Sequence, residues 1–209
     1  MMPEPSPTIR EQMVSRIQSH GRGWVFTPSS FEDLCGRSAI STNLQRLREA
    51  GTIRQLARGL YDYPKTHKKL GVLAPSVDAI AEALKGSKGI RLQPTGAYAA
   101  NMLGLSTQVP MKVMFLTDGP ARTVKVGNQE IVLKQTSPRN MATAGRISGL
   151  VIQALRHLGR DHVDDTILDK LAHRLDQEAV DQLKADIRFA PGWIADLIRT
   201  LQDRPEFRK

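Results

Sequence analysis

Residues 36–63 read GRSAISTNLQRLREAGTIRQLARGLYDY. The first part predicts a helix, because Ile40, Leu44 and Leu47 recur at the spacing that puts them on one face. The hydroxyl of Ser38 can cap the start of that helix. A helix with one apolar face packs that face inward and leaves the opposite face to solvent or to a partner.

The outward face of this helix is short and polar. It carries Ser38, Thr42, Gln45 and Glu49, with Ser41 and Arg46 on either side. Side chains of this kind suit base edges in a DNA groove, and arginines at the margins suit phosphates. The simpler alternative is an ordinary solvated helix face, which the helix taken alone does not exclude.

The segments on both sides of this helix predict the rest of an N-terminal domain. Ile9, Met13 and Ile17 form the stripe of a first helix, and residues 29–34 suit a short second helix with a capping box from Ser29. Residues 52–56 and 60–63 read as two strands joined at Gly59. A winged helix-turn-helix has this order of elements: a helix, a short helix, a longer helix and a hairpin. In that fold the short and the longer helix form the helix-turn-helix, and the longer one enters the major groove.

Positive charge is concentrated on the same segment. Residues 36–69 hold eight Lys and Arg against two acids, a balance of +6 out of +9 for the whole chain. We expect the bases to be contacted by Ser38, Ser41, Thr42, Gln45 and Arg46. We expect the phosphates to be contacted by Arg37, Arg48, Arg54, Arg58, Lys65, Lys68 and Lys69.

The sequence predicts an α+β protein of two domains. Residues 7–64 form the winged helix-turn-helix, residues 65–75 a lysine- and proline-containing linker, and residues 76–205 a mixed domain that ends in helices. In this second domain we expect a helix at 76–86, strands at 90–92 and 111–117, a helix at 96–103, a hairpin about 127–128, a long helix at 137–157 and three further helices.

Charge is also uneven in the second domain. Residues 91–160 carry nine Lys and Arg against two acids, and the tail from Asp161 is acidic. The basic stretch either extends the DNA footprint or contacts an acidic or RNA partner; the plain alternative is that the acidic tail neutralises it.

Motifs for enzyme chemistry are missing from the sequence. Gly86-Ser87 is not followed by the pair of carboxylates that a nucleotidyltransferase uses to hold Mg²⁺. There is no Walker loop and no zincin motif, and Asp164 and Asp165 are explained as residues that begin a helix. We therefore expect neither catalysis nor a metal or other cofactor.

The cellular location follows from composition. The single cysteine, Cys35, cannot form an internal disulfide, and we expect it to be structural. No stretch approaches the length of a membrane span, and the first eight residues lack the apolar region of a signal peptide. We expect a cytoplasmic protein with no membrane partner.

Several motifs resemble those of the antitoxins of AbiE-type (type IV) toxin–antitoxin systems. The resemblance runs over residues 8–160 and rests on Trp24–Thr27 through Ala50-Gly51, Leu56–Pro64, Leu92–Asn101, Leu103–Leu105 and Ala154–Gly159. It implies a winged helix whose reading helix is Ser38–Ala50 and whose wing is Ile53–Tyr63. It also implies repression of the protein's own operon at an inverted repeat, and a C-terminal domain that counters a nucleotidyltransferase toxin.

Two other functions stay open at this point. The protein can be a stand-alone transcription regulator whose C-terminal domain senses a ligand or dimerises. It can also be an enzyme that acts on nucleic acid, which would require a carboxylate pair such as one built on Asp161 or Asp164. The presence of a toxin gene beside this one would distinguish an antitoxin from a stand-alone regulator. The sequence leaves the oligomeric state open.

Overall fold

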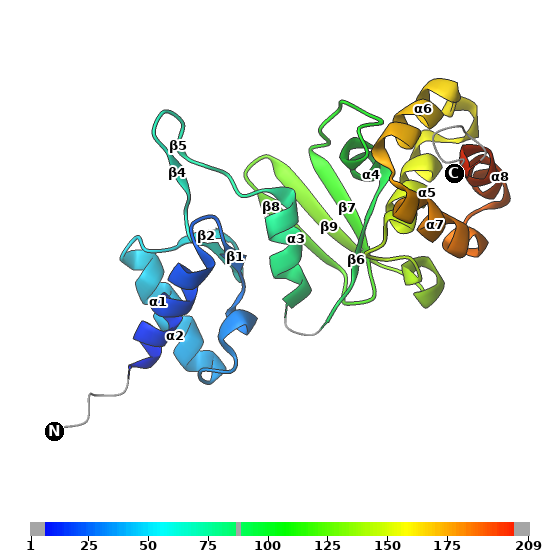
Figure 1. Ribbon diagram of the computed structural model, residues 1–209. Helices are drawn as coiled ribbons and strands as arrows, with labels where there is room; N and C mark the ends of the chain where they lie inside the picture. The colour runs from blue at the N-terminus through cyan, green and yellow to red at the C-terminus, as the bar shows by residue number, and fades with distance from the viewer. Residues whose placement is uncertain (1–6, 87–88, 203–209) are drawn as a thin grey trace. The chain divides into compact units, whose positions relative to one another are not determined.

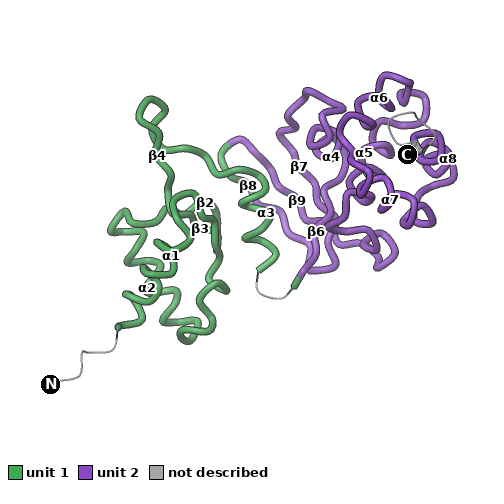
Figure 2. The backbone as a smooth tube through the Cα atoms, in the orientation of Figure 1, with its two compact units in different colours: residues 1–89, 125–127 green, residues 90–124, 128–209 purple. Residues whose placement is uncertain are grey.

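The computed structural model describes residues 7–86 and 89–202. The chain is mixed α+β and divides into two units: unit 1 comprises residues 1–89 and 125–127, and unit 2 comprises residues 90–124 and 128–209 (Figure 2). The sequence predicts a boundary at 65–75, whereas helix α3 (Val77–Lys85) groups with unit 1. The end of the predicted second domain, residues 203–205, lies outside the described residues.

Two amphipathic helices begin unit 1 (Figure 1). Helix α1 (Ile9–His20) is capped by Thr8 and Glu11, which bond reciprocally. It buries Met13 and Ile17 of the predicted stripe, whereas Ile9, in its first turn, is 37% exposed. Helix α2 (Arg37–Glu49) buries Ile40, Leu44 and Leu47, which confirms the predicted apolar face.

The caps expected for two helices are wrong. Helix α2 begins one residue before Ser38, with Gly36 as its N-cap and no side-chain hydrogen bond there. Ser29 likewise caps nothing, because it lies inside the 3₁₀ helix η1 (Pro28–Phe31), and its hydroxyl bonds to that of Thr27. Both serines lie inside the first turn, whereas a capping side chain comes from the N-cap residue that precedes that turn.

Unit 1 also contains a three-stranded sheet. Strands β1 (Val25–Phe26), β2 (Arg54–Ala57) and β3 (Leu60–Asp62) lie in the order β1-β3-β2, with β3 antiparallel to both neighbours. The turn between β2 and β3 uses Gly59 at φ 68°, a conformation that favours glycine.

The core of unit 1 joins these elements through apolar and aromatic side chains. Phe26 and Phe31 are fully buried and meet edge to face, and Trp24 packs against both rings. Helix α3 lies against β1 and buries Val77, Ile80, Ala81 and Leu84. Its apolar contact with β1 explains why α3 groups with unit 1.

The predicted linker contains a second hairpin. Strands β4 (Thr66–His67) and β5 (Gly71–Val72) pair antiparallel as a separate two-stranded sheet, which extends away from the helices of unit 1 (Figure 1). All the residues of both strands are exposed. An exposed hairpin lacks the buried alternation that identifies a strand in a sequence, so the pattern did not predict it.

Unit 2 is built on a four-stranded sheet in the order β6-β7-β9-β8. Strand β6 (Leu92–Thr95) pairs antiparallel with β7 (Lys112–Thr117), and β7 pairs parallel with β9 (Gln129–Gln135). Strand β8 (Arg122–Val126) and strand β6 are the two edge strands, and Gly127 at φ 58° turns the chain from β8 into β9. Helix α4 (Gly96–Met102) follows β6 directly.

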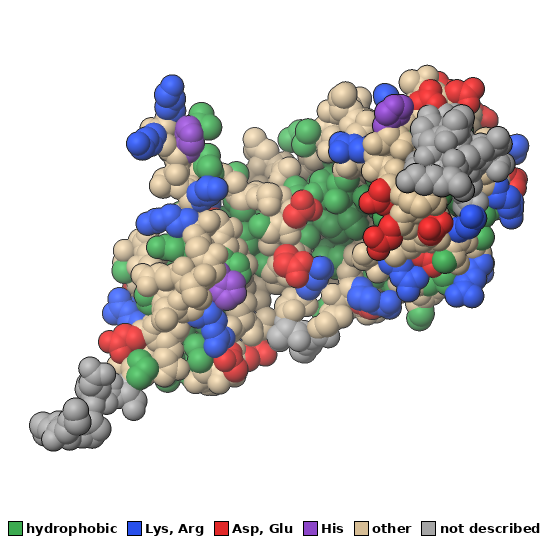
Figure 3. Space-filling model, in the orientation of Figure 1, with side chains coloured by type: hydrophobic (Ala, Val, Ile, Leu, Met, Phe, Trp, Pro, Cys, Tyr) green, Lys and Arg blue, Asp and Glu red, His purple; other side chains and the backbone are tan. Residues whose placement is uncertain are grey.

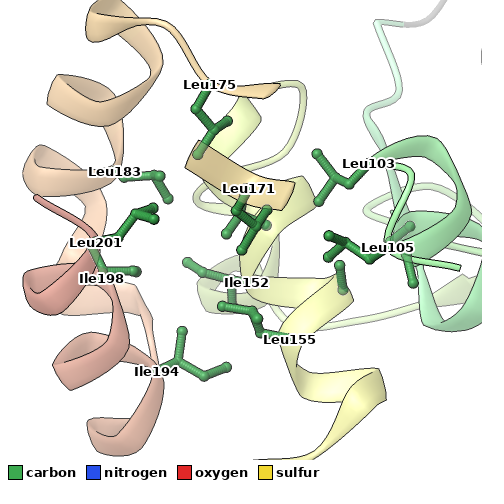
Figure 4. Packing of buried hydrophobic residues seen from close by; sticks show 14 of the residues in the cluster. Leu103, Leu105, Ile152, Leu155, Leu171, Leu175, Leu183, Ile194, Ile198 and Leu201 are labelled. Carbon is green, nitrogen blue, oxygen red and sulfur yellow. The ribbon is translucent and has the colours of Figure 1, made fainter. Parts of the chain in front are cut away.

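Five helices form the main apolar core of unit 2 (Figure 4). They are α4, α5 (Ile147–Leu158), α6 (Asp165–Arg174), α7 (Gln177–Asp186) and α8 (Gly192–Gln202). Figure 4 shows leucine and isoleucine side chains from these helices, and from the residues just after α4 and α6, pointing toward one another. The three helices after α5 match the prediction.

The long helix predicted from residue 137 begins ten residues later than expected. Ser137 and Pro138 start only a 3₁₀ helix, η3 (Pro138–Met141), and α5 begins at Ile147. Tertiary contacts hold the intervening segment out of the helix: Thr143 is buried, and Arg146 forms an ion pair with the buried Asp186.

Candidate nucleic-acid interface

Helix α2 presents the predicted polar face to solvent. Ser38, Ser41, Thr42, Gln45 and Arg46 are all exposed. Two of these side chains are held by bonds within the helix. The hydroxyl of Thr42 donates to the carbonyl of Ser38 at 3.1 Å, and Gln45 Nε2 donates to Glu49 Oε1 at 2.9 Å. A base contact by Gln45 therefore requires an exchange of hydrogen-bond partner.

Arginines border this polar face. Arg37, the first residue of α2, and Arg46, in its last turn, are exposed. Arg48 is also exposed, and its guanidinium donates to Gln55 Oε1 on β2 at 2.7 Å. This bond links the end of α2 to the first strand of the hairpin and fixes the position of one predicted phosphate contact.

Arg54 differs from the other predicted contacts, because its guanidinium is already engaged. It donates to both carboxylate oxygens of Asp62, at 3.1 and 2.5 Å, and to the carbonyl of Leu73 at 3.0 Å. The bond to the buried Asp62 raises the pKa of Arg54 above its usual value. Arg54 therefore ties β2, β3 and the chain after β5 together, and we do not retain it among the phosphate contacts.

The remaining predicted contacts lie on the two hairpins. Arg58 is exposed in the turn between β2 and β3. Lys65, Lys68 and Lys69 are exposed at the base and turn of the β4–β5 hairpin, and Figure 3 shows Lys and His side chains gathered there. The hairpin also exposes Leu70 and Val72, with 74% and 53% of their surfaces accessible.

Arg22 is a basic residue near this surface that the sequence analysis did not select. Its guanidinium lies 4.8 Å from the centre of the Tyr63 ring and donates to the carbonyl of Pro64 at 3.0 Å. It lines a hollow of about 520 Å³ together with His20 and Lys65. Gly21-Arg22-Gly23 was the only sequence signal, since two glycines around one arginine indicate a tight turn that exposes it.

The acidic and histidine residues that could suggest a metal site are not gathered into one in the part of the chain that the structure describes. Among residues 7–86 and 89–202, no three His, Cys, Asp or Glu side chains come close enough together to hold a metal ion. Asp164 caps α6 by accepting from the amide of Ile167, as expected of an acid that begins a helix. Cys35 is a half-buried free thiol against the core of unit 1. No helix in the described ranges combines the length and the apolarity needed to cross a membrane.

These features define a two-unit α+β protein whose N-terminal unit presents a polar helix face bordered by arginines and two basic hairpins. Residues 12–183 match the family described as "Family of unknown function (DUF6088)", and because the match covers most of the chain, the protein belongs to that family. No curated protein matches the chain significantly.

Proposed function

We propose that this protein binds duplex DNA through a winged helix-turn-helix in unit 1 and represses its own operon as the antitoxin of a type IV toxin–antitoxin pair. In this proposal η1 and α2 form the helix-turn-helix, α2 enters the major groove, and the β2–β3 hairpin is the wing. The proposal makes the protein a DNA-binding regulator and assigns it no catalytic step.

One observation carries the DNA-binding part: the exposed face of α2 has hydroxyl and amide side chains in its middle and arginines at its edges. Hydroxyls and amides read base edges, and guanidiniums pair with phosphates, so the order of side chains across this face suits a groove and its two walls. The one acid on this face, Glu49, is the last residue of α2 and is hydrogen-bonded to Gln45.

The two hairpins add positive charge to unit 1. Arg58 lies in the first turn, and Lys65, Lys68 and Lys69 lie on the second hairpin, all of them exposed. Each lysine or arginine that neutralises a phosphate releases condensed counterions, which favours binding and makes it sensitive to salt. The proposed footprint therefore extends from α2 over both hairpins.

The antitoxin part rests on the resemblance to AbiE-type antitoxins in residues 8–160. This resemblance implies that the operator is an inverted repeat upstream of the protein's own gene. It also implies that the toxin is a nucleotidyltransferase encoded by a neighbouring gene. Unit 2 is then the part that counters the toxin, and the protein acts in the cytoplasm.

A fluorescence anisotropy titration tests the DNA-binding part. The labelled probes are the DNA upstream of the gene and a scrambled duplex of equal length, each measured over a range of salt concentrations. We expect tighter binding to the upstream DNA and an affinity that falls steeply with salt. Equal, weak binding to both duplexes would contradict a specific operator.

Co-expression tests the antitoxin part separately. The product of the neighbouring gene should arrest growth when expressed alone and should not do so beside this protein. Arrest that persists in the presence of the protein, together with specific operator binding, would leave a DNA-binding regulator that is not an antitoxin.

The second candidate function is a stand-alone regulator whose unit 2 senses a ligand. A polar cavity in unit 2, between η3, α5 and the residues after α7, favours this candidate. Operator affinity that changes on addition of a small molecule would distinguish it from the antitoxin.

A further inference from the structure

Unit 2 contains a small cavity whose walls come from three separate segments. Its volume is about 250 Å³. One wall is formed by Arg139 and Asn140 of η3 with Thr143 behind them, a second by Ile152, Gln153 and Arg156 of α5, and a third by Phe189, Ala190 and Pro191. Every one of these residues belongs to unit 2, so a ligand in this cavity would bind independently of DNA binding by unit 1.

The charged side chains that line this cavity are all positive. Arg139 and Arg156 border it, and its lining contains no carboxylate. Within the described ranges neither arginine forms an ion pair, whereas the nearby Arg146 is neutralised by Asp186 at 2.8 Å. Two guanidiniums beside one small cavity repel each other, and an anion bound between them relieves that repulsion.

The floor of the cavity offers further donors from buried side chains. Gln153 has 8% of its surface exposed, and its Oε1 accepts from the hydroxyl of Thr95 at 2.9 Å. Its Nε2 makes no hydrogen bond with the part of the chain that the structure describes. Thr143, 6% exposed, likewise has a hydroxyl with no partner among those residues. Both groups are open to solvent, because among the described residues the one enclosed polar side-chain atom without a hydrogen-bond partner is Oε1 of Gln93. An acceptor bound in the cavity can therefore replace water at these two donors.

The donor set identifies the chemical class of ligand. Guanidinium groups pair with tetrahedral oxyanions through parallel N–H···O bonds, and neutral amide and hydroxyl donors complete the shell of such an anion. The volume lies below the range of about 300–1,000 Å³ that is usual for drug-sized ligands. Ile152, Phe189 and Pro191 supply apolar surface for a short attached group.

We infer that this cavity binds the phosphate group of a small molecule, held by Arg139 and Arg156 at the rim and by Gln153 and Thr143 at the floor. Inorganic phosphate and a phosphomonoester share this chemistry and differ only in whether the apolar wall is used. The site lies outside the proposed DNA-binding surface and gives unit 2 a ligand of its own.

Thermal unfolding of the full chain, followed by circular dichroism, tests this inference. The probes are inorganic phosphate and a nucleoside monophosphate, each compared with sodium chloride at equal ionic strength. At one-hundredfold excess over the Kd, we expect a bound anion to raise the Tm by about 5 °C. If the Tm increase saturates at a lower concentration of the monophosphate than of inorganic phosphate, the ligand is an esterified phosphate. If the two probes saturate it at the same concentration, the ligand is the free anion.

Matched arginine variants locate the site. Arg139→Gln and Arg156→Gln should each weaken phosphate binding by about tenfold in calorimetric titrations, because each removes a charge-assisted donor. Arg160→Gln removes the same charge from an exposed position of unit 2 that does not line the cavity, and should bind as the native protein does. Equal affinity in all three variants, or an equal Tm increase with sodium chloride, would overturn the inference.

Discussion

Arg54 and Asp62 face each other across the ladder between β2 and β3, and two hydrogen bonds join the guanidinium to the carboxylate. The side chain of Asp62 is 2% exposed, and that of Arg54 is 35% exposed. This pair therefore places a buried negative charge beside a cation that remains in contact with water.

Replacement of Arg54 should destabilise unit 1. Arg54→Ala leaves the Asp62 carboxylate buried without its partner, and we expect a loss of about 2 kcal/mol in the free energy of unfolding. The expected loss lies below the range for fully buried pairs because Arg54 is partly solvated. Chemical denaturation measures it, with Arg37→Ala as the control, expected to stay within about 0.5 kcal/mol. Equal stability of the two variants would show that the pair contributes nothing.

Gln45→Ala should change which DNA sequence the protein prefers. Loss of an amide that reads a base edge should reduce the ratio of upstream to scrambled affinity by about tenfold. Glu49→Ala is the matched control, because it removes the acid that holds Gln45 and leaves the amide in place. An unchanged ratio in Gln45→Ala would exclude this side chain from base recognition.

Lys68→Ala combined with Lys69→Ala should weaken binding to every DNA sequence alike. Two phosphate contacts contribute about 1.8 to the slope of log affinity against log salt, so the slope should become shallower by about that amount. Lys85→Ala is the control, since Lys85 lies on α3 and already pairs with Glu82 at 2.5 Å. A slope that is the same in the double variant and in the control would remove the β4–β5 hairpin from the footprint.

Gly149→Ala should destabilise unit 2, although alanine normally favours a helix over glycine by about 1 kcal/mol. A Cβ at position 149 would lie 2.3 Å from the carbonyl oxygen of Thr143 and 2.4 Å from Oε1 of Gln93. Relief of this clash requires movement of the backbone, and we expect a loss of about 3 kcal/mol. Gly192→Ala, at the start of α8 with open space around it, should be neutral or slightly stabilising. Thermal unfolding of both variants distinguishes the clash from the helix preference.

Acid should weaken unit 2 in part through Asp118. Hydrogen bonds from the Arg91 side chain, and then from its backbone amide, hold the pKa of this carboxyl below its usual 3.8. A carboxyl with a lowered pKa contributes stability at pH values above 3.8, and this contribution is lost as the pH falls through the folded-state pKa. Because both groups are well exposed, we expect the contribution to stay below about 1 kcal/mol.

A pH series of unfolding curves measures this contribution. Asp118→Asn should be less stable than the native protein at neutral pH and equally stable in strong acid. Asp161→Asn changes an exposed acid of unit 2 and should follow the native curve throughout. A constant difference between Asp118→Asn and the native protein at every pH would assign the effect to packing instead.

The spacing of apolar residues in the sequence predicted those helices and strands that bury one face at a regular period. Ile40, Leu44 and Leu47 fixed the orientation of α2, and hence which polar side chains face outward. The strand at 112–117 and the turn at Gly127 were predicted for the same reason, since alternation and turn chemistry are local properties.

The features that were missed depend on which residues lie opposite one another in the fold, or leave no apolar pattern in the sequence. Nothing near Arg54 indicates that Asp62 will lie opposite it, because the strand register brings the two together. The late start of α5 depends on Asp186, forty residues after Arg146. The β4–β5 hairpin buries none of its own strand residues, so it leaves no apolar period to detect.

The packing of α3 against β1 determines where the chain can be divided. A fragment that ends within residues 65–75 would lack Val77, Ile80 and Leu84, and would leave the apolar surface that they cover open to water. Such a fragment should aggregate, whereas one that continues through Gly86 keeps the helix that covers β1. Dissection of this protein into separately expressed halves therefore has to cut after α3, well beyond the prolines that mark the boundary in the sequence.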